Sequence, residues 1–442
     1  MTRLQEQTLS ELSAAFDAPL PRVVTRTGTV LSCAGQTVQV AGLCGQAGIG
    51  ARMVIDGTRR GDVIADDGQS VTVALYGSSQ GLTSGLRAEL VPESALRPGP
   101  DWLGKVLDYD GRDAFGTHPR PGQDAVDLFA SPPPAGHRRT LGGRLTTGYA
   151  AIDTFLPLCR GQRMGLFAGS GVGKTSLLGG LAQGSNADVT VIALIGERGR
   201  EVRSFVEEVV GPDAMRNTVV FAATSDQPPA AKLRAARLAM ATAERFRDQG
   251  QHVLFLFDSL TRFAQAHREV ALSVGETPAL RAFPPSTFPA LASLCERAGP
   301  GADGTGGDIT AVFSVLVQGS DMEEPVADTV RGILDGHIIL DRAIAESGRY
   351  PAIDIGRSIS RALPNAASET ENALLSSARS LLRSYEDGRL MVQSGLYAAG
   401  SDPVLDKAVA CHPQFDTFLR QRNIATIDES FAGLQNAIGV TG

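Results

Sequence analysis

Residues 164–178, MGLFAGSGVGKTSLL, carry the pattern that most strongly indicates the fold of this chain. An apolar run ends at Ala168, three alternating glycines follow, and Lys174 and Thr175 stand before a second apolar run. Glycine lets the backbone turn tightly enough for successive N–H groups to point at phosphate oxygens, and the positive end of a helix dipole adds to the attraction. The pattern therefore predicts a strand, a phosphate-binding loop and a helix, in that order.

The side chains of this loop predict a site for ATP with Mg²⁺. Lys174 is expected to reach the β- and γ-phosphates, and the hydroxyl of Thr175 is expected to ligate the metal ion. Ala168 stands where the strict pattern has its first glycine, a change that is tolerable where a strand enters the loop. The residues expected to bind the nucleotide are Gly169, Ser170, Gly171, Val172, Gly173, Lys174, Thr175 and Ser176.

Outward from the loop, residues from about 145 to 362 alternate between strand, loop and helix. Near-continuous apolar strands that alternate with helices are typical of a mostly parallel sheet covered on both faces, which is an α/β fold. A helix is expected at 230–248, whereas residues 299–308, GPGADGTGGD, are too rich in glycine for a strand or a helix. The strands are expected at 164–168, 189–196, 217–224, 252–259, 309–317 and 336–340.

The flanking regions differ in pattern from this central part. Short alternating runs separated by glycine and aspartate turns predict a small β-barrel or sandwich before it. Residues 371–387 place apolar side chains on one helix face, and residues 128–144 have the proline and glycine of a linker. The predicted domains are a helical segment (1–19, with a helix at 3–16), a β-barrel (20–95), a linker or crossing segment (96–144), the α/β domain (145–362) and a C-terminal helical domain (363–442).

Two carboxylates that follow strands are candidates to complete the site. Asp258 ends an apolar strand and is expected to hold a water bound to Mg²⁺. Glu197 follows the strand 189–195, which we expect beside the phosphate-loop strand, and it is the candidate to activate the attacking water. The alternative for Glu197 is an exposed side chain paired with Arg198 or Arg200, and at this point both interpretations stay open.

Composition excludes several classes of protein. A chain of 442 residues, 43% hydrophobic and 20% charged, predicts a soluble globular protein of two or three domains. A net charge of −7 disfavours non-specific binding to nucleic acid. We expect neither a signal peptide nor a membrane-spanning segment, because residues 1–20 carry no long apolar run and later runs fall short of the roughly 20 residues that span a bilayer. Five scattered cysteines predict reduced thiols in the cytosol, and the spacing of His and Cys predicts no zinc site.

Five ordered blocks of the sequence resemble the type III secretion ATPases: LFAGSGVGKTSLL, LIGERGREV, DSLTRFAQAHREVAL, SDMEEPVADTVRGILDGHIIL and YPAIDIGRSISR. This family includes the flagellar protein-export ATPases and is related to the catalytic subunits of rotary proton ATPases. The likeness runs from about residue 20 to the C-terminus, and it implies a RecA-like P-loop NTPase domain at 145–362. It also implies Mg²⁺-dependent ATP hydrolysis by a homohexameric ring that energises the export of flagellar proteins.

The resemblance also implies roles for individual residues. Glu197 would be the general base, Arg198 would contact the γ-phosphate side, and Glu201 would support the site. Tyr350 would stack on adenine, with a plain core residue as the alternative. Arg361 would be an arginine finger that reaches the nucleotide of a neighbouring subunit, worth about 10³–10⁵ in rate, with a surface cation as the alternative.

The resemblance implies partners and a location as well. The partners would be a cytosolic regulator bound through the helix at 3–16, proteins of the export gate and stalk, and export chaperones with their substrates. The ring would be cytoplasmic and would reach the inner face of the membrane only through the export apparatus, and no nucleic acid would bind. Gln318 departs from an acidic residue that is common in the family.

Four alternative functions stay open. An injectisome secretion ATPase would share the nucleotide site, and a rotary proton-ATPase catalytic subunit would use the same chemistry in a hetero-ring. A hexameric RNA translocase would need basic residues and stacking aromatics in its N-terminal domain, whereas residues 1–95 hold seven Arg, no Lys, nine acidic residues and only two aromatics. A ring subunit without turnover would lack the carboxylate at Glu197.

Overall fold

The computed structural model describes most of the chain, in the ranges 25–91, 96–114, 116–304, 306–317 and 322–439. The helix expected at 3–16 and Gln318 lie outside these residues. The chain forms two compact units, and the division falls between Glu93 and Ser94, except that Leu75–Ser78 group with the second unit. The first unit holds a β-barrel, and the second holds the α/β sheet and the C-terminal helices.

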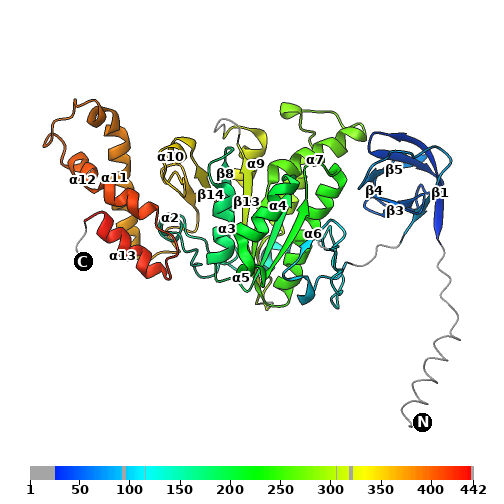
Figure 1. The fold of residues 1–442 in the computed structure, drawn as a ribbon, viewed down its shortest axis with the longest axis horizontal. Helices are drawn as coiled ribbons and strands as arrows, with labels where there is room; N and C mark the ends of the chain where they lie inside the picture. The colour runs from blue at the N-terminus through cyan, green and yellow to red at the C-terminus, as the bar shows by residue number, and fades with distance from the viewer. Residues whose placement is uncertain (1–24, 92–95, 115, 305, 318–321, 440–442) are drawn as a thin grey trace, which may run out of the picture. The chain divides into compact units, whose positions relative to one another are not determined.

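The first unit is a closed β-barrel (Figure 1), as the alternating sequence pattern predicts. Val38 and Val40 in β2 are fully buried, while Gln39 between them is exposed. This period of two puts one face of each strand into the barrel. Around the barrel the strands follow the order β1 (Arg26–Ala34), β2 (Thr37–Ala41), β5 (Ser70–Leu75), β4 (Arg59–Asp66), β3 (Arg52–Ile55) and β6 (Arg87–Leu90), and β6 pairs again with β1.

The second unit is built on a mostly parallel sheet, which confirms the predicted α/β class. Strand β8, which leads into the phosphate loop, pairs in parallel with β13 on one side and β14 on the other. The carboxyl ends of these strands therefore lie at one edge of the sheet. Across the sheet the order is β15 (Ile359–Ser360), β14 (Gly336–Leu340), β8 (Arg163–Ala168), β13 (Asp308–Leu316), β11 (His252–Asp258), β9 (Val189–Ile195), β10 (Thr218–Ala223) and β7 (Val106–Leu107).

The position of β9 corrects one prediction. The expectation that the strand before Glu197 lies beside the phosphate-loop strand is wrong, because β11 and β13 lie between β9 and β8. Parallel strands are joined by long crossovers, so strands that are consecutive in the sequence need not be neighbours in the sheet. Glu197 still follows the carboxyl end of a strand that runs parallel to its neighbours, at the edge where sites in such sheets form.

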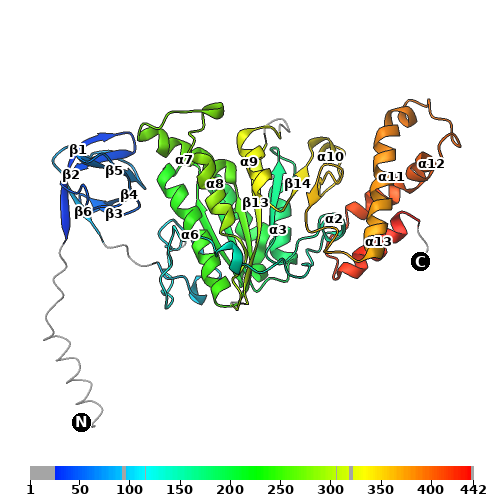
Figure 2. The same cartoon turned by 180° about the vertical axis from the view of Figure 1, so that it is seen from behind.

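Helices cover both faces of the sheet (Figures 1 and 2). Along β9, Ile192 and Leu194 enter one apolar core, whereas Val191 and Ala193 enter the other. The first core is completed by α2 (Ala150–Phe155), α3 (Lys174–Gly184) and the C-terminal helices. The second core is completed by α6 (Pro229–Asp248), α7 (Leu260–Ser273), α8 (Thr287–Glu296) and α9 (Pro325–Ile333).

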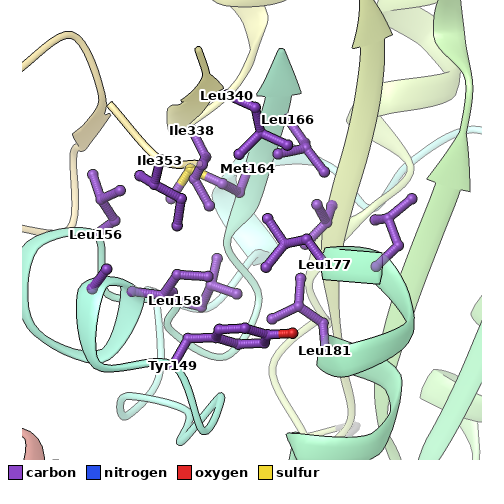
Figure 3. Close-up of a cluster of buried hydrophobic side chains, with 14 of the residues drawn as sticks. Tyr149, Leu156, Leu158, Met164, Leu166, Leu177, Leu181, Ile338, Leu340 and Ile353 are labelled. Carbon is purple, nitrogen blue, oxygen red and sulfur yellow. The ribbon is translucent and has the colours of Figure 1, made fainter. Parts of the chain in front are cut away.

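The first core holds the two elements that flank the phosphate loop. Figure 3 shows Leu177 and Leu181 of α3 in one cluster with Leu166 of β8 and Ile338 of β14. Full burial of an aliphatic side chain of this size contributes about 1.5–3 kcal/mol. The strand before the loop and the helix after it are thus anchored in the same apolar contacts, which fixes both ends of the loop.

Two segments that the sequence presents as loops contribute strands. Within the predicted linker 96–144, β7 pairs in parallel with β10 and extends the sheet. The strand β12 (Gly299–Pro300) pairs with the start of β13, so the prediction that 299–308 is entirely loop is wrong at both of its ends. Both added strands are two residues long, which is too short for a hydrophobic period to be visible in the sequence.

The C-terminal residues form helices, as predicted. A capping box of Ser368 and Glu371 starts α11 (Glu369–Gln393), and α12 (Pro403–Leu419) and α13 (Ile427–Ala437) follow. Across the residues that the structure describes, no helix combines the length and the apolar character needed to cross a bilayer. The shorter helical elements are η1 (Pro100–Trp102), η2 (Ala135–His137), α4 (Gly199–Ser204), the π-helical η3 (Phe205–Val210), α5 (Gly211–Met215), η4 (Leu280–Ala282) and α10 (Arg342–Glu346).

The buried side chain of Arg297 forms hydrogen bonds both to the segment 96–144 and to the helix α6 of the second core. The side chain of Arg297 is 3% exposed, and its Nε donates to Oε1 of Glu244 in α6 at 2.9 Å. Its Nη1 donates to the carbonyl oxygen of Leu128 at 2.6 Å. The segment 96–144 is therefore part of the packed second unit as well as a connection.

We expect Arg297→Ala to lower the free energy of unfolding by about 3–5 kcal/mol, because Glu244 would remain as an unpaired buried charge. Urea unfolding can be followed by the fluorescence of Trp102, the one tryptophan of the chain, which is buried in the same unit. Arg203→Ala is the control, since its ion pair with Glu207 is exposed and such pairs contribute at most about 1 kcal/mol. Equal unfolding midpoints for the two variants would contradict the assignment.

Candidate active site

The phosphate loop connects β8 to α3, as the sequence predicts. Gly171 and Gly173 have φ angles of 79° and 90°, in the left-handed region that favours glycine. The side chain of Val172 is 2% exposed and anchors the loop in the core, while Ser170 is exposed. The helix begins at Lys174, so the free N–H groups of its first turn lie at the end of the loop.

Lys174 brings two carboxylates from other strands to the loop. Its Nζ donates to Oδ1 of Asp258 at the end of β11, and it lies 3.7 Å from Oε1 of Glu197, which follows β9. The side chains of Lys174 and Asp258 are 11% and 4% exposed. The structure therefore brings together three of the residues that sequence reasoning selects for phosphate, metal and water.

Asp258 has a further partner that the sequence does not indicate. The hydroxyl of Ser314, a fully buried residue in β13, donates to Oδ1 of Asp258 at 2.6 Å. This bond fixes the orientation of the carboxylate from the neighbouring strand. The available signal is a serine with apolar neighbours on both sides, Phe313 and Val315, and its role can be recognised only when β13 is known to lie beside β11.

Glu197 lies in surroundings that raise its pKa above the ordinary value of 4.5. Burial of the carboxylate is the main cause, the negative charge of Asp258 adds to it, and the positive charge of Lys174 opposes it. The backbone carbonyl oxygen of Glu197 accepts a hydrogen bond from the N–H of Ser225 at 2.8 Å, which ties the turn after β9 to the end of β10. A carboxylate with a raised pKa is a better proton acceptor than an exposed one.

Arg198 and Glu201 are more exposed than this cluster, and the negative charge of Glu201 contributes to the raised pKa of Glu197. They pair with each other at 3.0 Å, and their side chains are 69% and 46% exposed. The alternative reading of Glu197, as an exposed partner of Arg198, does not match this arrangement. Arg262, which the sequence analysis does not select, has its side-chain stem beside Gly196 and its positive charge lowers the pKa of Glu197.

Tyr350 lies at the phosphate loop. A Cβ atom on Gly173 would lie 3.2 Å from Cδ1 of Tyr350, so the ring passes directly over this glycine. The side chain is 44% exposed, which rules out the alternative that it is a core residue. An exposed aromatic ring beside the loop is placed where it can stack on the base of a bound nucleotide.

Arg361 and the phosphate loop lie at opposite ends of the parallel strands. It follows β15, and its N–H donates to the carbonyl oxygen of Asp335 at 2.9 Å, next to the first residue of β14. Lys174 lies beyond the carboxyl ends of the parallel strands, whereas Arg361 lies at their amino ends. Arg361 is exposed, and its guanidinium has no carboxylate partner in the part of the chain that the structure describes. The structure does not bring Arg361 to the loop of its own subunit.

The residues at the loop fit Mg²⁺ bound with a nucleotide. Thr175 offers an exposed hydroxyl in the first turn of α3, and Asp258 offers a carboxylate, both of which are oxygen ligands of the kind Mg²⁺ prefers. The described residues contain no group of three or more His, Cys, Asp or Glu side chains that could hold a metal ion. A site that uses one carboxylate, waters and the phosphates of the nucleotide needs no such group.

Two protein-family models match the chain. Residues 148–360 match the nucleotide-binding domain of the ATP synthase alpha/beta family, and residues 367–436 match the C-terminal domain of the type III secretion ATPase EscN. The first range contains the phosphate loop and all the described strands of the sheet except β7, and the second contains α11, α12 and most of α13.

Curated relatives match over nearly the whole length. The chain is 43% identical to the flagellum-specific ATP synthase of Caulobacter vibrioides, over 93% of this chain and 95% of that protein. It is 44% identical to the flagellum-specific ATP synthase of Salmonella typhimurium, over 90% of each.

Solved structures match in fold as well. The assembled ATPase EscN of the enteropathogenic E. coli type III secretion system is 35% identical with a TM-score of 0.87, over 93% of this chain and all of that one. EscN in complex with its central stalk EscO matches with a TM-score of 0.84 at 36% identity and the same coverage. The chain therefore belongs to the family of the flagellum-specific ATP synthases and type III secretion ATPases, and it is an ATPase.

Proposed function

We propose that this ATPase energises the export of flagellar proteins through a type III secretion apparatus, as a homohexameric ring with an active site at each subunit interface. The observation that carries the proposal is the meeting of Lys174, Asp258 and Glu197 beside the phosphate loop. Hydrolysis of ATP needs positive charge at the phosphates and a carboxylate that activates water, and this cluster supplies both.

In the proposed mechanism, Lys174 exchanges one anionic partner for another. Its ammonium group pairs with the two carboxylates, and it would contact the β- and γ-phosphates of ATP. Thr175 and Asp258 would then hold Mg²⁺, which neutralises charge on the phosphates. Because Lys174 lowers the pKa of Glu197, its departure toward the phosphates makes Glu197 a stronger base for the attacking water.

The ring arrangement is supported by the position of Arg361. An exposed guanidinium at the amino ends of the strands cannot serve the loop of its own subunit, but it can serve the nucleotide of a neighbour in a closed ring. The assembled state of EscN supports the same arrangement, and its complex with a central stalk supports a stalk protein as a partner. In this proposal Arg198 turns toward the γ-phosphate from its exposed position, and Glu201 supports it.

The remaining partners and the location follow from the export function. A cytosolic regulator, export-gate proteins and chaperones with their substrates would contact a cytoplasmic ring held at the inner face of the membrane through the export apparatus. Flagellar export is favoured over injectisome export because the two flagellum-specific relatives are 43% and 44% identical, compared with 39% for the type 3 secretion system ATPase of Xanthomonas euvesicatoria. The competing function is that of a catalytic subunit in a rotary proton ATPase, which works in a hetero-ring. This function is disfavoured because one chain carries both Glu197 and Arg361, so identical subunits can supply the whole site.

Glu197→Gln is expected to bind ATP with unchanged affinity and to lower turnover by about 10²–10⁴-fold, the contribution of a general base. In the unchanged protein, turnover should fall on the acid side at a pH above 4.5, because the raised pKa lets Glu197 take up a proton at a higher pH than an exposed glutamate does. Turnover measured against pH checks both statements. Glu207→Gln, an exposed glutamate nearby, is the control and should hydrolyse ATP at the normal rate.

The same pair of variants tests the cellular function. In a deletion strain, the unchanged chain and Glu207→Gln should restore swimming and the secretion of flagellin, whereas Glu197→Gln should not. Normal swimming of the deletion strain itself would show that the export function is wrong even if ATP hydrolysis is confirmed.

Arg361→Ala and Lys174→Ala are each expected to be nearly inactive, yet a mixture of the two should hydrolyse ATP. In mixed rings some interfaces join a normal loop in one subunit to a normal Arg361 in the next, so an equal mixture should recover about a quarter of normal activity if the arginine acts across the interface. ATPase assays on co-assembled variants measure this recovery. If the mixture is as inactive as each variant alone, Arg361 does not act on the nucleotide of the neighbouring subunit.

A further inference from the structure

The segment that carries Tyr350 faces the phosphate loop on one side and the C-terminal helix α12 on the other. The ring of Tyr350 passes over Gly173. The side chain of the preceding residue, Arg349, extends to α12, where its Nη1 lies 3.4 Å from Oδ1 of Asp416. Its Nη2 donates to the carbonyl oxygen of Ile353 at 3.1 Å, which closes the turn around Tyr350.

A second arginine joins the same turn to the same carboxylate. Arg420, just after the end of α12, donates from Nη1 to the carbonyl oxygen of Gly348 at 2.7 Å. Its Nε and Nη2 lie 2.9 Å and 2.8 Å from Oδ2 of Asp416. Asp416 therefore connects two guanidinium groups, one on the turn and one bound to the backbone of the turn.

The base of this connection is rigid. The residue before Asp416, Phe415, is 5% exposed and packs edge-on against Phe155 of α2 with ring centroids 5.9 Å apart. The side chain of Arg349 is only 12% exposed, so its charge depends on the carboxylate beside it. A change in the position of α12 would reach the Tyr350 turn through these contacts.

We propose that Asp416 is a positioning residue for nucleotide binding, which holds the turn from Gly348 to Ile353 so that Tyr350 presents its ring to the nucleotide base. The inference rests on the proposed function, because it takes Tyr350 as the residue that stacks on the base. Asp416 touches neither the phosphate loop nor the nucleotide, so it governs the contribution of the base to affinity and leaves the contribution of the phosphates intact.

The test compares a ligand that has a base with one that lacks it. The affinities of the full-length chain for ADP and for inorganic pyrophosphate are measured by calorimetry, both in the presence of Mg²⁺. Tyr350→Ala should weaken ADP binding about tenfold and leave pyrophosphate unchanged, as expected for the loss of one stacked base. Asp416→Ala should weaken ADP binding about three- to tenfold, again without an effect on pyrophosphate.

Further variants separate positioning from simple loss of structure. Adding Asp416→Ala to Tyr350→Ala should cause no further loss, because the turn then has no ring to position. Arg420→Gln, which removes the bond to Gly348, should repeat the pattern of Asp416→Ala and serves as a second variant if the first does not fold. Asp387→Ala in α11, whose ion pair with Arg383 is exposed, is the control and should change neither affinity.

Three results would overturn the proposal, and they have different meanings. Normal ADP affinity in Asp416→Ala and Arg420→Gln, with weakened affinity in Tyr350→Ala, would refute positioning and leave the proposed function standing. Equal weakening of ADP and pyrophosphate would show that Asp416 acts through general structure. Normal ADP affinity in Tyr350→Ala would refute base stacking itself, and the positioning role with it.

Discussion

The ionic contact between Lys174 and the carboxylates of Asp258 and Glu197 is the interaction on which the active site depends. It joins the first residue of α3, the end of β11 and the turn after β9, which are remote from one another in the sequence. An ammonium group in this position neutralises carboxylates that would otherwise repel each other at short range. In the proposed mechanism the same ammonium group contacts the phosphates of ATP, so it links the carboxylates of the site to the nucleotide.

The fold makes this contact possible through the direction of its strands. Because β8, β13, β11 and β9 run parallel, the residues that follow them gather at one edge of the sheet. The apolar cores on both faces hold the strands and helices that flank the loop. The C-terminal helices share the first core, and Asp416 extends their influence to the turn that carries Tyr350. The C-terminal helices are therefore connected to the active site by packing contacts and by the contact between Asp416 and Arg349.

Local sequence patterns predict which helices and strands form, but they predict less well which of these elements lie side by side. The phosphate loop, the strands, the long helices and the two carboxylates follow from glycine spacing and apolar runs, and the structure places them together. The order of the strands, the hydrogen bond from Ser314 to Asp258 and the added strands β7 and β12 depend on pairings between distant segments, which no local period records. The contact between Arg349 and Asp416 also joins distant segments, so the role of either charged residue cannot be inferred from the sequence around it. The domain boundaries and the roles of the site residues stay predictions.

The proposed mechanism depends first on Lys174, which holds the phosphates of ATP in every subunit. The most direct measurement is the affinity for ATP and the turnover of Lys174→Ala, with Lys232→Ala as a matched lysine variant outside the loop. Both quantities should collapse in Lys174→Ala and stay normal in Lys232→Ala. Binding and hydrolysis at normal levels in Lys174→Ala would contradict the proposed mechanism.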